Sequence, residues 1–164
     1  MMGASEPGPD AVAAAYRLGE LLAGAGWAVL TGGRPAGVME AVCAGAKSVS
    51  GSLTIGILPT GPDGPVSAHV DVAVFTGMGE ARNAINVLSS EVVVACGVEG
   101  PGTASEVALA LRAGRPTVLL APPAAASAFF RTIRGPATLH EAPTPEAVVA
   151  LIEEELGVPR WCAV

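Results

Sequence analysis

The sequence has few charged residues and almost no lysine. Charged side chains make up 15% of its 164 residues, whereas about 25% is usual in soluble proteins. Lys47 is the only lysine, and fifteen acidic residues against nine basic ones give a formal net charge of −6. Nucleic acids and anionic membranes are recognised through basic surfaces. The composition therefore argues against either of them as the main partner.

Cysteine is scarce, and no apolar run is long. Cys43, Cys96 and Cys162 show neither CxxC nor Cys/His spacing, so we expect no disulfide framework and no metal site. Cys43 and Cys96 stand among apolar residues, which is typical of buried small hydrophobes. Pro, Gly or charge interrupts every apolar run before it reaches the length of a membrane span. Residues 1–10 lack the pattern of a signal peptide, and we expect a cytoplasmic protein.

Apolar residues and glycine are abundant instead. The hydrophobic fraction is 51% and the mean hydropathy is +0.52. Such a chain buries enough apolar surface to offset its ordering entropy, so intrinsic disorder is excluded. The 21 glycines and 14 prolines fall between apolar runs, as turns of a compact fold do. The length fits one domain, and we expect residues 1–164 to form it.

The apolar segments alternate between helical and strand-like patterns. Helices are predicted at residues 11–23 with Asp10 as N-cap, and at residues 37–47, 80–89, 103–113 and 145–156. Strands are predicted at residues 27–31, 53–58, 70–76, 92–96 and 117–120. Strands that alternate with helices and are apolar on both faces indicate a parallel sheet covered on both sides. The sequence predicts a doubly wound, three-layer α/β/α fold.

Glycines collect where the predicted strands end. The exits carry Gly32-Gly33, then Gly77 and Gly79, then Gly97, Gly100 and Gly102. Ligands of doubly wound sheets lie beyond the carboxyl ends of the strands. Glycine lets backbone approach a ligand closely, and helix N-termini attract anions. We therefore expect a small phosphorylated ligand at this edge.

Three common cofactor motifs are absent. Residues 41–48 are not a P-loop, because Ala41 and Ala46 occupy both glycine positions. Residues 97–102 lack the G-x-G-x-x-G pattern of NAD sites. Lys47, the one candidate for a pyridoxal phosphate Schiff base, falls at a helix end, where a solvated lysine is typical.

Two polar residues stand out near the glycine-rich exits. Thr103-x-x-Glu106 has the spacing of a capping box, which would occupy both side chains structurally. Alternatively, Glu106 faces a bound phosphosugar and acts on its hydroxyls or in acid–base chemistry. Arg82, in the first turn of its predicted helix, opposes the helix dipole. It is either a solvated surface charge or a bidentate phosphate ligand.

Three segments together resemble the SLOG superfamily. They are Thr31-Gly32-Gly33 with Gly37-Val38-Met39-Glu40-Ala41, then Thr76 to Asn83, and then Gly100 to Glu106. Within the superfamily the sequence is most similar to the group of molybdenum cofactor carrier proteins. The LOG (Lonely Guy) phosphoribohydrolases, often mislabelled lysine decarboxylases, are a related branch. The resemblance covers about residues 3 to 156 and implies a Rossmann-like, usually dimeric, nucleotide-binding fold.

The resemblance also implies site residues. Arg82 and Glu106 match the catalytic pair of the LOG branch, which cleaves the N-glycosidic bond of nucleoside monophosphates. Residues implied to bind ligand or phosphate are Gly32, Gly33, Gly37, Met39, Gly77, Asn83, Gly100, Gly102 and Thr103.

The leading interpretation is a nucleotide- or phosphate-ligand-binding protein of this superfamily. It requires no cofactor, forms a homodimer and holds a bound nucleotide or molybdenum cofactor. The alternatives are a LOG-like phosphoribohydrolase that uses Arg82 and Glu106, and carriage of a molybdopterin-type cofactor. Val98-Glu99 replaces the Pro-Gly that opens the LOG motif, and Arg34-Pro35-Ala36 is poorer in glycine than the family pattern. Both departures favour binding over catalysis.

One further departure concerns the fold. Family members begin with an apolar strand that enters a Gly-Ala-Ser type loop, but here Gly3-Ala4-Ser5 follows only Met1-Met2. We expect the first strand to be missing, either because translation starts upstream or because the chain is a truncated paralogue. A gap in the sheet would then favour low stability or tight dimerisation.

Overall fold

The computed structural model describes residues 1–98 and 100–156. Its strands are β1 Met2–Gly3, β2 Val29–Thr31, β3 Thr54–Leu58, β4 Val72–Phe75, β5 Val93–Cys96, β6 Thr117–Leu120 and β7 Leu139–Ala142. Its helices are α1 Pro9–Gly24, α2 Gly37–Lys47, the 3₁₀ helix η1 Gly79–Arg82, α3 Asn83–Leu88, α4 Pro101–Arg112, α5 Ala124–Ile133 and α6 Pro145–Leu156. Glu99 and Cys162, which figured in the sequence predictions, lie outside the described residues.

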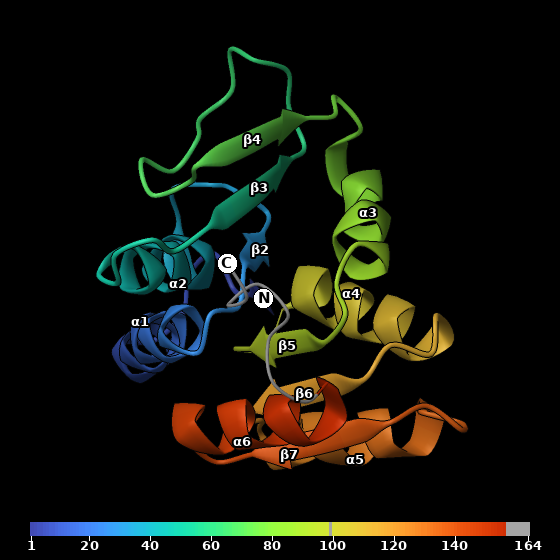
Figure 1. The fold of residues 1–164 in the computed structure, drawn as a ribbon. Helices are drawn as coiled ribbons and strands as arrows, with labels where there is room; N and C mark the ends of the chain where they lie inside the picture. Colours follow the sequence, from blue (N-terminus) through green and yellow to red (C-terminus); the bar gives the residue numbers. More distant parts are fainter. Residues whose placement is uncertain (99, 157–164) are drawn as a thin grey trace.

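All strand pairs are parallel, as predicted for an α/β fold. The strands form two groups, ordered β1-β5-β6-β7 and β2-β3-β4. Helices α1 and α2 lie on one side of the strands, and α3 and α4 lie on the other (Figure 1). Strands β5 and β6 are buried along their whole length, as expected for strands covered on both faces. The prediction of a Rossmann-like, doubly wound architecture is confirmed.

The expected absence of the first strand needs one correction. Residues Met2–Gly3 form the two-residue strand β1, which pairs with β5 through Met2 opposite Ala95 and Gly3 opposite Cys96. On its other side, the Met1 nitrogen donates a hydrogen bond of 2.6 Å to the carbonyl oxygen of Leu30, which lies in the middle of β2. Because β1 is so short, it forms no ladder with β2, and the strands therefore divide into two groups.

Some predicted elements differ from the observed ones. Helix α1 begins at Pro9 with Gly8 as N-cap, so the prediction of Asp10 as N-cap is wrong and Asp10 lies in the first turn. The predicted helix 80–89 is divided into η1 and α3. Helix α5 and strand β7 were not predicted. Strand β7, Leu-His-Glu-Ala, carries little apolar pattern and is defined by its pairing with β6.

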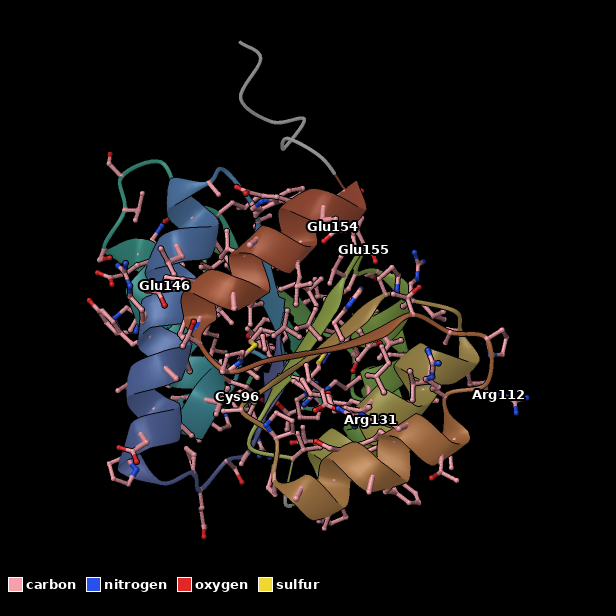
Figure 2. The ribbon with its side chains drawn as sticks, turned by 90° about the horizontal axis from the view of Figure 1, so that it is seen from below. Cys96, Arg112, Arg131, Glu146, Glu154 and Glu155 are labelled. Atoms are coloured by element: carbon pink, nitrogen blue, oxygen red, sulfur yellow. The ribbon has the colours of Figure 1, made fainter. Side chains whose placement is uncertain are left out.

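The main apolar core lies where α1 and α2 pack on β2 and β5. It includes Leu18, Val38 and Val42, none of which exposes any surface. Cys43 and Cys96 are buried, as predicted, and Cys96 lies among the central elements in Figure 2. Within residues 1–98 and 100–156, no helix has the length and apolar character required to cross a membrane.

Candidate functional site

A cavity of about 990 Å³ opens where β1, β2 and β5 end. Its wall includes the segment that leaves β1, the glycine-rich exit of β2, and the first turn of α4 after β5. Eight of the predicted site residues contribute to the wall: Gly32, Met39, Arg82, Asn83, Gly100, Gly102, Thr103 and Glu106. The structure therefore gathers residues from three separate sequence segments around one space.

Three predicted ligand-binding glycines are not part of this wall. Gly33 and Gly37 both adopt positive φ, at 69° and 55°. A Cβ at Gly37 would collide with the carbonyl oxygen of Ala4, and a Cβ at Gly33 would approach the Cα of Gly56 to 2.9 Å. These two glycines therefore allow the chain to turn and pack closely beside the cavity. Gly77, with φ of 64°, has open space around it.

Arg82 and Glu106 face each other across the cavity wall. Arg82 lies at the end of η1 and Glu106 in the second turn of α4, and they are 5% and 7% exposed. Their closest atoms, Nη1 and Oε1, are 3.7 Å apart, which is longer than a hydrogen bond. The Nε and Nη1 atoms of Arg82 are buried and have no hydrogen-bond partner. The interpretation of Arg82 as a solvated surface charge is therefore wrong.

The capping-box interpretation of Thr103 and Glu106 is also wrong. Helix α4 begins at Pro101, its N-cap is Gly100, and no side chain caps it. Thr103 and Glu106 thus lie inside the helix, where both are buried. Glu106 is available for an interaction in the cavity, and the first-turn N–H groups of α4 have no intrahelical acceptor.

Burial shifts the protonation of both members of the pair. Burial raises the pKa of Glu106 above its ordinary value, and the positive charge of Arg82 opposes that shift. Burial lowers the pKa of Arg82, while the carboxylates of Glu106 and Glu80 act in the opposite direction. Each group therefore depends on the charge of the other to remain ionised.

Gly32 makes room for the Arg82 guanidinium group. A Cβ at Gly32 would lie 2.6 Å from Nη2 and 2.8 Å from Nη1 of Arg82, and 2.8 Å from the sulfur of Met39. The contacting atoms are the ends of two flexible side chains that line the cavity, so a Cβ at Gly32 would push them into that space. The glycine at the end of β2 is thus required by a side chain from a distant segment.

Replacing Gly32 with alanine is expected to displace Arg82 into the cavity and to destabilise the fold by about 1 kcal/mol, the low end of the range for overpacking. Thermal unfolding measures the loss. The matched control is Gly102→Ala, because a Cβ at Gly102 meets nothing within 4 Å. Equal melting temperatures for the two variants would contradict this account of Gly32.

Sequence reasoning missed other polar residues of the cavity. Arg34, Ser5 and Glu80 line it, and Asn86 donates a hydrogen bond that lowers the pKa of Glu106. Arg34 could have been found, because it is a cation directly after the Gly32-Gly33 exit. Asn86 gave no local signal. In the part of the chain that the structure describes, no three His, Cys, Asp or Glu side chains are placed to hold a metal ion.

The fold and the cavity define a Rossmann-like α/β protein with a polar, ligand-sized site at the carboxyl ends of its parallel strands. The chain belongs to the SLOG cluster4 family, whose model matches residues 1–149. The resemblance to the SLOG superfamily that the motifs indicated is thereby confirmed.

Individual relatives agree with this assignment. The molybdenum cofactor binding protein of the phototrophic bacterium Rippkaea orientalis has 46% identity and a TM-score of 0.88, with 93% of each chain covered. The molybdenum cofactor carrier protein of Chlamydomonas reinhardtii has 41% identity and a TM-score of 0.87, with 94% of this chain and 95% of the other covered. An uncharacterised protein of Archaeoglobus fulgidus is 42% identical over 123 residues, or 75% of this chain and 79% of its own.

Proposed function

We propose that this protein binds and carries a molybdenum cofactor, a phosphorylated pterin, as cargo in the cavity between β2 and α4. The observation that carries the proposal is the buried guanidinium group of Arg82, which lines the cavity with Nε and Nη1 unpartnered. A buried donor without an acceptor is costly unless a ligand satisfies it. The names of the two similar proteins supply the identity of the cargo.

The phosphate group of such a cargo fits the start of α4. Gly100, Gly102 and Thr103 lie there on the cavity wall, and no side chain caps the helix. The free first-turn amides and the helix dipole favour an anion at this end. Arg82 would add a charge-assisted hydrogen bond. Met39 and Asn83, both buried in the wall, would contact the remainder of the ligand.

We also propose that the protein acts as a cytoplasmic homodimer of single-domain chains. Strand β4 lies at the edge of its group and exposes Val72, Val74 and Phe75 by 46%, 41% and 39%. Exposed edges that carry apolar side chains are commonly covered by another chain.

Carriage predicts that the protein retains its cargo through purification. Protein expressed in a host that makes molybdenum cofactor should contain molybdenum by elemental analysis, and oxidation should release a fluorescent pterin in equal amount. Apo-protein mixed with a cofactor-loaded donor should acquire the same pterin. If purified protein holds neither molybdenum nor pterin and acquires none from the donor, the proposal is wrong.

A second candidate is LOG-like hydrolysis of nucleoside 5′-monophosphates. It is favoured by the position of Glu106, a buried carboxylate of raised pKa beside Arg82 on the cavity wall. Such a group suits acid–base work on a glycosidic bond. Incubation with AMP separates the candidates: a carrier releases no adenine or ribose 5-phosphate, whereas an enzyme releases both and loses that activity in Glu106→Gln.

A further inference from the structure

A second hollow lies at the end of the sheet opposite the cavity, where β6 and β7 begin. It has a volume of about 440 Å³ and is formed by the ends of α4 and α5 and by the turns that follow them. Its apolar lining includes Leu111 and Ala137, which are buried, and Ile133, which is 44% exposed. Arg112 and Arg134 line it from the two helix ends. This basic groove therefore combines an apolar lining with two cations.

Both arginines of the basic groove lack an anionic partner. Arg112 lies in the last turn of α4, Arg134 directly follows α5, and both are exposed. Among residues 1–98 and 100–156, no carboxylate oxygen lies within 4 Å of either guanidinium group. The chain as a whole has a net charge of −6. Two unpaired cations beside an apolar hollow on an acidic protein favour an acidic partner, because complementary charges steer and align docking surfaces.

The chain itself carries a matching acidic run at the end of α6. Glu153, Glu154 and Glu155 are consecutive there, and all three are exposed. Carboxylates in the last turn of a helix oppose its dipole, so local helix stability does not account for them. Glu155 Oε1 lies 2.8 Å from His140 Nε2 of β7. Glu153 and Glu154 have no ion-pair partner in the part of the chain that the structure describes.

The acidic run and the basic groove lie at the same end of the sheet and on opposite faces. Helices α4 and α5 end just before β6 and β7 begin, and the contact with His140 places the end of α6 beside β7. Helix α6 packs in the core cluster that contains α1, whereas α4 and α5 pack in a separate cluster. Figure 2 shows Glu154 towards the end of α6 and Arg112 at the end of α4.

We propose that two copies of this chain associate end to end through the amino ends of their strands, with the acidic run of each copy against the basic groove of the other. A twofold axis in the plane of the sheet and across the strands exchanges the two faces and reverses the strand direction. Both charged contacts then form at once, and the assembly closes as a dimer. Each cavity lies at the far end of its copy and stays accessible. The contact is separate from the edge of β4 and does not depend on the cargo.

Sedimentation equilibrium with two charge-reversed variants tests the contact. Arg112→Glu/Arg134→Glu makes both surfaces acidic. Glu153→Arg/Glu154→Arg makes both surfaces basic. At low salt each variant alone should have half the molar mass of the wild type, because like charges face each other. An equal mixture of the two should recover the wild-type mass, because opposite charges meet again. Salt at about 0.5 M should weaken the wild-type association at least 10-fold, since it screens exposed charges.

The matched control is Asp10→Arg/Asp63→Arg. It changes the net charge by as much as Glu153→Arg/Glu154→Arg does. Both of its positions are exposed and lie towards the carboxyl ends of the strands, in the first turn of α1 and in the loop after β3. This variant should keep the wild-type mass. The proposal is overturned if the wild type has the same mass as either charge-reversed variant, if the mixture does not associate, or if the control variant loses association.

Val74→Glu separates the end-to-end contact from the exposed edge of β4, where Val74 is 41% exposed. Combined with Arg112→Glu/Arg134→Glu, it should have half the mass of Val74→Glu alone. Equal masses would place the association at β4 and overturn the end-to-end contact. Retained molybdenum and pterin are a separate readout. Protein that associates without retaining cargo contradicts the carrier proposal alone, and protein that retains cargo without associating contradicts the end-to-end contact alone.

Discussion

Arg82→Met is expected to abolish retention of the cargo and to lower stability at the same time. The substitution removes the guanidinium group, which lines the cavity, and charge-assisted hydrogen bonds from such a group are worth about 1.5–3 kcal/mol. We therefore expect cargo affinity to fall roughly 10- to 100-fold, measured as the molybdenum and pterin that remain after purification. The same change leaves Glu106 buried without its main counter-charge, although the charge of the Met1 amino group still acts on it. Removal of one partner of a buried ion pair costs up to about 3–5 kcal/mol.

The stability loss in Arg82→Met should depend on pH. Burial already raises the pKa of Glu106, and loss of the positive charge raises it further. The folded state then holds a proton that the unfolded state releases, so stability falls as pH rises from the unfolded pKa, about 4.3, towards the folded pKa. In chemical unfolding, the free energy of unfolding of the variant should lie further below that of the wild type at pH 8 than at pH 5. A deficit that does not change with pH would contradict this account.

The double variant Arg82→Met/Glu106→Gln separates binding from folding. A neutral amide replaces the unpaired carboxylate, so most of the lost stability should return. Cargo retention should not return, because the guanidinium donors are still missing. If the double variant retained cargo as the wild type does, Arg82 would have no direct role in binding.

Gly45→Ala is expected to be the most destabilising conservative change in the helices. A Cβ at Gly45 of α2 would collide with the backbone carbonyl of Tyr16 in α1, and a Cβ at Gly19 of α1 would collide with that of Val42 in α2. The two helices thus pack closely because each places a glycine, Gly19 or Gly45, against the backbone of the other. Alanine at Gly45 would force the two backbones apart. The surrounding core, including Leu18, is buried, so a separation of the helices would disturb its packing.

We expect Gly45→Ala to cost about 3 kcal/mol, the upper part of the range for overpacking, and to lower the melting temperature by on the order of 10 °C. Gly24→Ala is the matched control. Gly24 ends α1, and a Cβ there meets nothing within 4 Å. Because alanine favours helix by up to about 1 kcal/mol over glycine, that variant should be as stable as the wild type or more so. A melting temperature of Gly45→Ala near that of the wild type would refute the close helix contact.

Some elements could be predicted from local sequence, and others could not. Residues 37–47, 117–120 and 145–156 have the bounds of α2, β6 and α6, because apolar spacing and flanking glycine or proline specify them locally. Helix α5 was missed although its residues are amphipathic, with Phe130 buried on one face. A local signal for this helix is therefore present in the sequence. Strand β7 depends on its pairing with β6, which is not a property of its own residues.

The sequence by itself determined the alternation of strands and helices, the glycine-rich exits and the family, because each depends on residues that are close together in the chain. It also provided Arg82 and Glu106 as candidates. Only the tertiary structure decided that the two face each other, that Gly32 accommodates the guanidinium group, and that Arg34 shares their cavity. These relations join β2 to η1 and α4, over strands whose spatial order does not follow their order in the chain. Local patterns specify elements, whereas distances between elements are set by how the whole chain packs.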